Sequence, residues 1–525
     1  MAWLTGLTGL LTMFAANRGW CADAPDSHDP LLDLFIKKGF VTQAEAEKVK
    51  AEADYNRTNG LAGSLPAPSK WKISDGVKNV ELFGDIRLRY ESRSAEDPKG
   101  GSIDLDRLRY SVRVGLRGEA FDDFYYGVRI ETSSNPRSSW GTFGNSSSGP
   151  FGKSTAGINV GQVYLGWRPE EWVNFTVGKM PNPLYVTPMV WSPSLNPEGA
   201  AERFKFAIGE ADFFANFGQF LYQDTNPTRT SDGYFNPLTV NSTGLPFLLA
   251  WQAGVNYHLT EKVTLKVAPV LYQYANFNTQ PLSASGTGYS PDFFGIFVGQ
   301  GQTIGVNGTP ASYNLAGSTP GFDGFYANQT GINNLLVLEF PVELNIKLDK
   351  LNLRFFGDYA QNLKGASRAQ AAYDAAHSAY FSLSGPGAGQ ISQISSPQIH
   401  DVRAYQIGVG IGSTNLVYGP AQGLVYGTTS KKGAWEFRTY WQHIEQYALD
   451  PNLIDSDIFE GRENMEGIYA AFAYGFSDNI IGTVRYGYAN RINDKLGTGG
   501  SNQDISQMNP IDKYNLLQVE LGFRF

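Results

Sequence analysis

Apolar and polar residues alternate one by one over long stretches of the chain from residue 80 onward. Between 80 and 90 the even positions carry Val, Leu, Gly, Ile, Leu and Tyr, whereas the odd positions carry mainly charged residues. A second run with the same period covers 105–117. This alternation is typical of β-strands whose two faces meet unlike surroundings. A ten-residue strand, at about 3.4 Å per residue and tilted near 45°, spans about 24 Å, which is close to the apolar band of a membrane barrel.

The chain contains sixteen such segments, and their connections alternate between short and long. This asymmetry predicts an all-β fold, a transmembrane antiparallel up-and-down β-barrel of about sixteen strands, with tight periplasmic turns and long external loops. The connection 414–433 is long although it falls at the short-turn end. Either it hides a hairpin, which gives eighteen strands, or this turn carries an insertion. The segments start near residues 80, 105, 122, 158, 171, 201, 211, 246, 262, 335, 350, 402, 434, 465, 479 and 514.

Composition fits this interpretation. Charged residues make up 18% of the chain, below the roughly 25% of soluble domains, yet no apolar stretch approaches the roughly 18 residues of a membrane helix. Alternation explains both facts, because it hides apolar surface from any average. A net charge of −8 argues against a nucleic-acid partner. With five His, one Cys and no catalytic motif, we expect no metal, no cofactor and no enzymatic activity.

The N-terminal region reads as an export signal followed by a leader. Residues 4–16 are apolar, and Ala22-Asp23-Ala24 is a cleavage pattern, so 1–24 are expected to be a signal peptide. No Lys or Arg precedes the apolar run, which suggests a start codon further upstream; a segment without a targeting role is the alternative. Residues 25–75 are expected to form a short periplasmic helical segment and a linker, or a loosely ordered leader. The barrel is then expected over 76–525.

The last strand ends on aromatic residues. Residues 517–525 alternate strictly, with Phe523 and Phe525 on the apolar face. This ending predicts a C-terminal assembly signal, read by the outer-membrane assembly machinery. The alternative is the ordinary final strand of a soluble sandwich.

Six arginines lie opposite the apolar stripe of the first two strands, and paired strands would stack them into a basic ladder. Like charges in register repel each other, and a dry interior would not hold them without partners. A water-filled lumen would, and we therefore expect these residues to line a pore. The alternative is the solvated face of a soluble sheet. The ladder consists of Arg87, Arg89, Arg107, Arg109, Arg113 and Arg117.

The connection after the fifth segment is expected to fold inward over residues 180–200. Five prolines within 178–200 stiffen it, and Gly199 can adopt the positive φ that ends a tight turn. Its one acid, Glu198, would face the basic ladder and set up a transverse field. The alternative is an external loop over the rim. The expected constriction residues are Lys179, Pro181, Asn182, Pro183, Trp191, Asn196, Pro197, Glu198 and Gly199.

Several motifs carry a family resemblance. Gly-Lys-Met-Pro-Asn-Pro at 178–183, followed by Leu-Asn-Pro-Glu-Gly-Ala at 195–200, resembles the hallmark of the putative porin family of Gram-negative bacteria. The stretches 162–167, 356–362 and 455–457 are similar to that family as well. The resemblance implies an outer-membrane barrel without a catalytic role. The chain departs from the family's pattern at Ser192 and Ser194, where acids are expected, so the ladder faces few acids and an anion preference follows.

These observations predict an outer-membrane porin of a Gram-negative bacterium, a passive aqueous channel for ions and small hydrophilic solutes with a weak preference for anions. A substrate-specific porin for phosphate, an organic acid or an oligosaccharide is the first alternative. A secreted carbohydrate-active β protein is the second. The expected partners are outer-membrane lipid and lipopolysaccharide, the assembly machinery, small hydrophilic solutes and two further copies in a homotrimer.

Overall fold

The computed structural model divides the chain into two compact units, residues 1–73 and 74–525. The expected signal peptide, helical segment and linker lie outside the described residues, apart from 37–38 and 42. All further description concerns the second unit. Its described residues are 76–98, 100–121, 123–133, 138–144, 152, 156–222, 247–275, 296–298, 302–303, 325–327, 334–370, 396–413, 422–498, 504–505 and 510–525.

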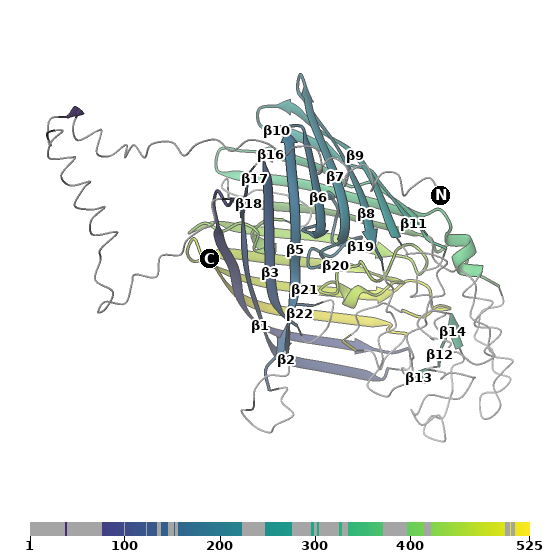
Figure 1. Ribbon diagram of the computed structural model, residues 1–525. Coiled ribbons are helices and arrows are strands. Elements are labelled where there is room, and N and C mark those ends of the chain that lie inside the picture. Colours follow the sequence, from purple (N-terminus) through teal and green to yellow (C-terminus); the bar gives the residue numbers. More distant parts are fainter. Residues whose placement is uncertain are drawn as a thin grey trace. The chain divides into compact units, whose positions relative to one another are not determined.

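The described part of the second unit forms a closed antiparallel barrel of sixteen strands (Figure 1). Two of these strands are interrupted at Pro269 and Pro341, which lack the N–H that a ladder bond needs. Each therefore counts as two segments, β10 with β11 and β15 with β16. The segments are β1 (Glu81–Glu96), β2 (Ser102–Glu119), β3 (Phe124–Ser133), β5 (Gly157–Glu170), β6 (Val173–Lys179), β7 (Glu198–Ile208), β8 (Ala211–Leu221), β9 (Phe247–Thr260), β10 (Val263–Val267), β11 (Val270–Ala275), β15 (Leu336–Glu339), β16 (Val342–Lys347), β17 (Leu351–Asn362), β18 (Arg403–Ser413), β19 (Trp435–Ile444), β20 (Met465–Gly475), β21 (Ile480–Arg491) and β22 (Lys513–Arg524).

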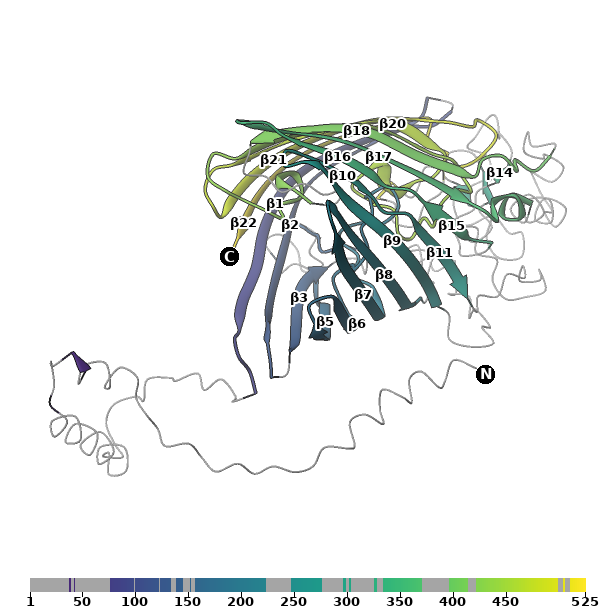
Figure 2. The ribbon, with the colours of Figure 1, turned by 90° about the horizontal axis from the view of Figure 1, so that it is seen from above.

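The barrel closes between its first and last strands. β1 pairs with β22 from Asp85↔Arg524 to Glu96↔Lys513, and every other pair joins neighbours along the chain. β18 pairs directly with β19, from Ala404↔Ile444 to Gly412↔Glu436. No further strand lies between them, so the sixteen-strand prediction is confirmed and the eighteen-strand alternative is excluded. Figure 2 shows β5 to β8 on the side of the barrel opposite β18 and β20.

The two faces of the wall differ as the alternation predicts. On β1, Leu82, Ile86 and Leu88 point outward and are exposed, whereas the arginines between them point into the lumen. Leu517, Val519 and Leu521 continue this outward apolar surface on β22. Exposed apolar side chains on one continuous face suit hydrocarbon rather than water as their surroundings.

The remaining elements lie in the connections. β4 (Gly141–Thr142) pairs with β2, and β12 (Ile296–Val298), β13 (Gln302–Thr303) and β14 (Phe325–Ala327) form a small separate sheet. Residues 365–370 are helical, and η3 (Leu424–Tyr426) and η4 (Phe459–Gly461) are single 3₁₀ turns. No helix in the described ranges is long and apolar enough to cross a membrane.

The buried apolar side chains lie between the barrel wall and connections that fold into the lumen. One cluster joins Met189 and Trp191 of the connection after β6 to Leu449 and Leu453 of the connection after β19. A second cluster joins Leu424 of η3 and Phe459 of η4 to wall residues such as Tyr440 and Tyr469. The inward connections are therefore packed structures rather than loose flaps, and they shape the lumen.

Candidate functional site: the pore lumen

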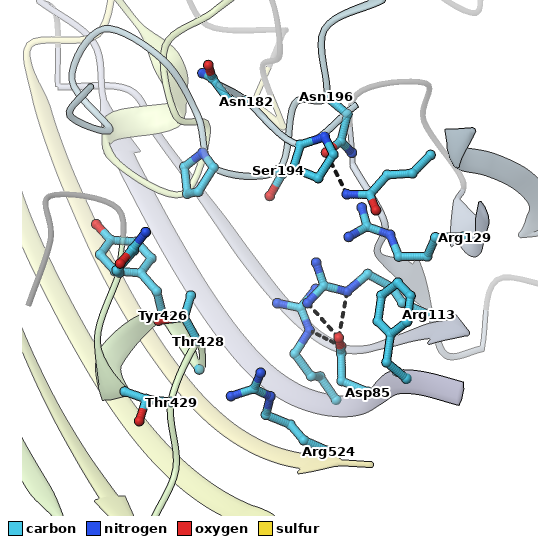
Figure 3. A pocket seen from close by; sticks show the side chains of 18 of the residues that line it. Asp85, Arg113, Arg129, Asn182, Ser194, Asn196, Tyr426, Thr428, Thr429 and Arg524 are labelled. Carbon is cyan, nitrogen blue, oxygen red and sulfur yellow. Dashed lines mark hydrogen bonds and ion pairs between the residues drawn. The ribbon is translucent and has the colours of Figure 1, made fainter. Parts of the chain in front are cut away.

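A cavity of about 870 Å³ lies inside the barrel. The wall strands β1, β2, β3 and β22 supply its charged side, and connections that fold inward supply its other sides. In Figure 3, Arg113, Arg129 and Asp85 lie on one side, Asn182, Ser194 and Asn196 on a second, and Tyr426, Thr428 and Thr429 on a third. Charged side chains are concentrated on the first of these sides, and Lys266, Asp455, Asp457 and Arg485 add further charges elsewhere in the lining.

One part of the basic ladder lines this cavity. Arg87, Arg113 and Arg117 all belong to its lining. Asp85 lies between the first two, with its carboxylate 3.0 Å from Arg87 Nε and 2.6 Å from Arg113 Nη2. Arg117 instead pairs with Glu81 across the register, at 2.7 Å. This part of the ladder faces the open lumen.

Of the other three arginines of the ladder, Arg89 and Arg109 are buried and Arg107 is half-buried. Arg89 and Arg109 are opposite each other in the register of β1 and β2, and their mutual repulsion requires nearby acids. Glu520 of β22 accepts from Arg89 at 2.7 Å, and Glu91 lies between Arg107 and Arg109, 3.6 Å from Arg109. Arg89 still borders the cavity, but Arg107 and Arg109 do not line it.

Two glycines lie at the base of the connection between β6 and β7. Gly178 and Gly199 are opposite each other at the ends of β6 and β7, with φ values of 119° and 149°. A Cβ on Gly178 would lie 2.3 Å from the carbonyl oxygen of Val163, and one on Gly199 would lie 2.1 Å from that of Gln219. Only glycine fits either position. Above them, Met180 N donates to Pro197 O at 2.9 Å and closes the loop.

This inward loop, residues 180–197, crosses to the wall formed by β9 and β15–β17. Tyr185 N donates to Gln252 of β9 at 2.9 Å, and the Tyr185 hydroxyl donates to Glu343 of β16 at 2.5 Å. The Thr187 hydroxyl donates to Asp358 of β17. Both carboxylates are buried, so these bonds are shielded from water and hold the loop strongly.

The expected constriction residues take different places on this loop. Pro181, Asn182, Trp191 and Asn196 line the cavity, and the Asn196 side chain accepts from Gln162 of β5 at 3.0 Å. Trp191 is buried against Phe220 and Tyr272. Pro183 and Pro197 do not belong to the cavity lining but lie in the turns on either side of it.

Glu198 differs from the expectation. It pairs with Lys179 at 2.5 Å, opposite it in the register. On β6 this position continues the row of the exposed, outward Val177, so alternation turns both side chains away from the lumen. Glu198 therefore does not face the ladder, and the acids near the arginines come from elsewhere.

The missing acids lie on a connection whose inward path the sequence analysis did not predict. Residues 445–464, between β19 and β20, return into the lumen and dock on the first loop. Ser192 N donates to Leu453 O at 2.6 Å, and Asp455 N donates to Pro188 O at 3.1 Å. Asp457 accepts from Arg89 at 2.8 Å. The sequence does contain one indication that this connection is buried, because a loop in water would rarely carry so many apolar residues. These residues are Leu449, Leu453, Ile454, Ile458 and Phe459.

The two acids of this second inward loop have opposite pKa shifts. Burial, together with the nearby charge of Asp457, raises the pKa of the Asp455 carboxyl to about 7. Burial also disfavours the charged form of Asp457, but the adjacent Arg89 guanidinium outweighs it and holds the pKa of Asp457 at about 2. One negative charge therefore stays beside Arg89 at neutral pH, and the other can gain or lose a proton there.

The chain terminus closes the cavity at the short-turn end. Phe525 lines it, and its backbone exchanges hydrogen bonds with Gly84 of β1 at 2.9 and 3.1 Å. Phe523 lies on the outward row, opposite Ile86. Among the described residues, no group of His, Cys, Asp and Glu has the arrangement of a metal site.

A family model with the description "Putative porin" matches residues 100–525, whereas no curated protein matches the chain. Three solved structures of outer-membrane proteins are similar at low level. The anion-selective porin from Comamonas acidovorans has 8% identity and a TM-score of 0.39, over 85% of this chain and 99% of that one. The outer membrane channel DcaP of Acinetobacter baumannii has 12% identity and a TM-score of 0.39, over 87% and 99%. OmpT of Vibrio cholerae has 11% identity and a TM-score of 0.37, over 86% and 99%.

Likeness at these TM-scores establishes nothing about this chain, so the assignment rests on the family match. That match covers every strand of the barrel except β1, from β2 to β22, and it confirms the resemblance seen in the motifs at 178–200. The chain therefore belongs to this family of putative porins, and its sixteen-stranded barrel lies in the outer membrane.

Proposed function

We propose that the protein is a passive aqueous channel for ions and small hydrophilic solutes, with a weak preference for anions and no catalytic role. The observation that carries the proposal is the excess of basic side chains around the lumenal cavity. Eight basic residues line it, against five acidic residues and the terminal carboxylate of Phe525. The basic residues are Arg87, Arg89, Arg113, Arg117, Arg129, Lys266, Arg485 and Arg524, and the acidic residues are Glu81, Asp85, Asp455, Asp457 and Asp478.

The position of the charges supports the same proposal. Arg113 and Arg87 share Asp85. The next acid, Glu520, lies 3.9 Å from Arg87 and is itself shared with Arg89 and Arg485, so arginines outnumber carboxylates there. The guanidinium of Arg524 lies beside them (Figure 3) and forms no ion pair within the part of the chain that the structure describes. A lumen with a positive surplus raises the local concentration of anions and lowers that of cations. Because the inward loop adds only neutral Asn182, Ser194 and Asn196 on its side, the transverse field is weak.

Reversal potentials of the refolded protein in planar bilayers test this proposal. Under a potassium chloride gradient, the reversal potential should have the sign of chloride permeation. A clear preference for potassium would contradict the anion preference but leave the channel itself standing, whereas absence of any current would contradict the channel.

A substrate-specific channel is the second candidate. The observation that favours it is the convergence of Arg87, Arg113, Arg129 and Arg524 on one part of the cavity, since guanidinium groups bind phosphate and carboxylate well. Such a channel would take phosphate or an organic acid rather than an oligosaccharide. If phosphate binds in the lumen with a Kd of about 1 mM, millimolar phosphate should block the chloride current. Such a block would favour this candidate over the unspecific channel.

The proposed partners are membrane lipids, the outer-membrane assembly machinery and further copies of the chain. The exposed outward row of β22, with Phe523 at its end, supports contact with outer-membrane lipid and lipopolysaccharide and an assembly signal that includes Phe525. Deletion of Phe525 should lower the amount of folded protein in the outer membrane. A homotrimer is proposed by analogy with other porins. Chemical crosslinking in native membranes tests it, and the absence of crosslinked dimers and trimers would contradict it.

A further inference from the structure

The turn between β18 and β19 differs from the other turns at the short-turn end. Several of those turns are tight, such as 209–210 and 261–262, whereas residues 422–430 fold back into the barrel. Gln422 and Tyr426 to Ser430 all line the lumenal cavity. Figure 3 shows Tyr426, Thr428 and Thr429 across the cavity from Arg113 and Asp85. The cavity is thus bordered by a segment that enters from the end opposite the inward loop 180–197.

Buried charged groups of β19 hold this turn in place. The Glu436 carboxylate accepts from Val425 N at 3.1 Å, and Arg438 donates to Gln422 O at 2.7 Å. Glu436 and Arg438 also pair with each other at 2.5 Å. Both are almost fully buried, and hydrogen bonds from ionised groups to buried backbone atoms are about twice as strong as neutral ones. The turn is therefore clamped at two points.

A third charged contact and apolar packing complete the attachment. Arg485 of β21 donates to Val425 O at 2.8 Å. Leu424 and Val425 are fully buried in the cluster that includes Tyr440 and Tyr469. Gly423 has φ 109°, and a Cβ there would lie 2.6 Å from the Glu436 carboxylate, so the clamp fits closely around this residue. These contacts hold the turn in one packed conformation.

We infer that residues 422–430 are a second constriction of the pore, which narrows it from the periplasmic end, and that Glu436 and Arg438 are its positioning residues. This inference rests on the proposed channel function. A solute passing the cavity meets arginines on one side and the neutral hydroxyls of Tyr426, Thr428 and Thr429 on the other. Because the turn adds bulk without charge at these positions, it limits the size of solutes and the conductance, while the arginines determine the sign of the selectivity.

The clamp is tested by two variants of one residue. Glu436→Ala removes the acceptor for Val425 N, whereas Glu436→Gln keeps an oxygen in that place. We expect Glu436→Ala to raise single-channel conductance by about a third or more and Glu436→Gln to restore the wild-type value, with unchanged chloride preference in both. Equal conductance in all three proteins would overturn the positioning role.

Cysteine labelling tests the constriction in barrels that keep the clamp. In a background with Cys21→Ser, Thr428→Cys should react with a bulky neutral thiol reagent, and its conductance should fall by about half. Lys432→Cys is the matched control, because Lys432 belongs to the same connection and is exposed but does not line the cavity. It should react without loss of current. Modified Thr428→Cys channels with unchanged current would overturn the inference.

Two outcomes separate the proposed channel function from the second constriction. Unlabelled channels that pass no ions at all contradict the proposed function. Channels that conduct normally and whose current is unchanged after modification of Thr428→Cys contradict only the second constriction.

Discussion

Arg89 of β1 and Asp457 of the second inward loop form an ion pair at 2.8 Å, although 368 residues separate them in the sequence. Arg89 is almost fully buried, whereas Asp457 keeps part of its side chain exposed toward the lumen. The pair joins an arginine of the wall to the loop that supplies the missing acids. It satisfies a charge that would otherwise face Arg109 and, at the same time, fixes the loop inside the barrel.

Removing this carboxylate should loosen the loop. Asp457→Asn leaves Arg89 with Glu520 and, at 3.7 Å, Glu91, and we expect a loss of about 1.5–3 kcal/mol in loop docking, the range for a hydrogen bond to a charged group. Open-channel noise and mean conductance should both rise in bilayer recordings. Asp106→Asn is the control, because Asp106 bonds to Tyr90 on the outward face. If both variants give the same recordings as the wild type, Arg89–Asp457 does not hold the loop.

The arginine ladder should separate into two groups by experiment. Arg113→Gln together with Arg129→Gln removes two guanidinium groups from the cavity lining, and the chloride-to-potassium permeability ratio should fall by about twofold or more, because the local potential falls. Arg107→Gln should leave that ratio nearly unchanged, since Arg107 is paired with Glu91 and Asp504 outside the cavity. Reversal potentials distinguish the groups. A larger shift for Arg107→Gln than for the double variant would contradict this division.

The alternating pattern was sufficient to predict the barrel. All sixteen observed strands begin within three residues of the expected starts, and β2, β6 and β7 illustrate the small errors: they begin at Ser102, Val173 and Glu198 rather than near 105, 171 and 201. Alternation is a local property of the chain, and a barrel needs it in every strand. The strand made of β10 and β11 begins at Val263, next to its expected start at 262. Its interruption at Pro269 was not foreseen.

The inward paths of the connections could not be predicted in the same way. The loop 180–197 is stiffened by its own prolines, a local signal, but its attachment depends on Asp358 and Glu343, far away in the sequence. The loop 445–464 is likewise attached to distant residues such as Arg89 and Ser192, and the turn 422–430 is held by Glu436, Arg438 and Arg485 of later strands. Glu198 shows the same limit. Whether it faces the lumen depends on which row of β7 it occupies, and that row is set by where the strand begins.

Deleting the first inward loop should widen the pore. Replacing residues 185–195 by a short Gly-Ser linker removes Tyr185 and Thr187, which attach the loop to the opposite wall. Conductance should rise about two- to threefold, since the narrowest section of a channel limits its current. The matched control is a deletion of similar length within residues 276–295, in a connection that the sequence pattern predicts to be external. An unchanged current after loop deletion would mean that the loop does not limit ion flow.

Docking of the second inward loop should weaken as pH rises from about 4 to about 7. The pKa of Asp455 is raised from its ordinary value of 3.8 to about 7, by burial and by Asp457. The docked loop therefore holds a proton that the free loop gives up, and docking is fully stable only below about pH 4 and weakens up to about pH 7. Asp457 has the opposite shift, to about 2 beside Arg89, so its contribution changes only below about pH 4. Burial also raises the pKa of Glu460 and Glu463 on the same loop. Ionisation of these carboxyls with rising pH therefore weakens docking, as ionisation of Asp455 does.

Single-channel recordings between pH 5 and pH 8 check this expectation. Conductance and open-channel noise should increase with pH in the wild type, and Asp455→Asn should reduce that increase, because asparagine remains neutral and can still accept the hydrogen bonds from Ser192 and the Asp457 backbone. Ser192→Ala is the companion variant. It removes one of those two bonds without removing the titrating group, so its pH dependence should persist. A wild-type current that falls with pH over this range would contradict the assignment, since a carboxyl with a raised pKa in the docked state can only favour undocking as it ionises.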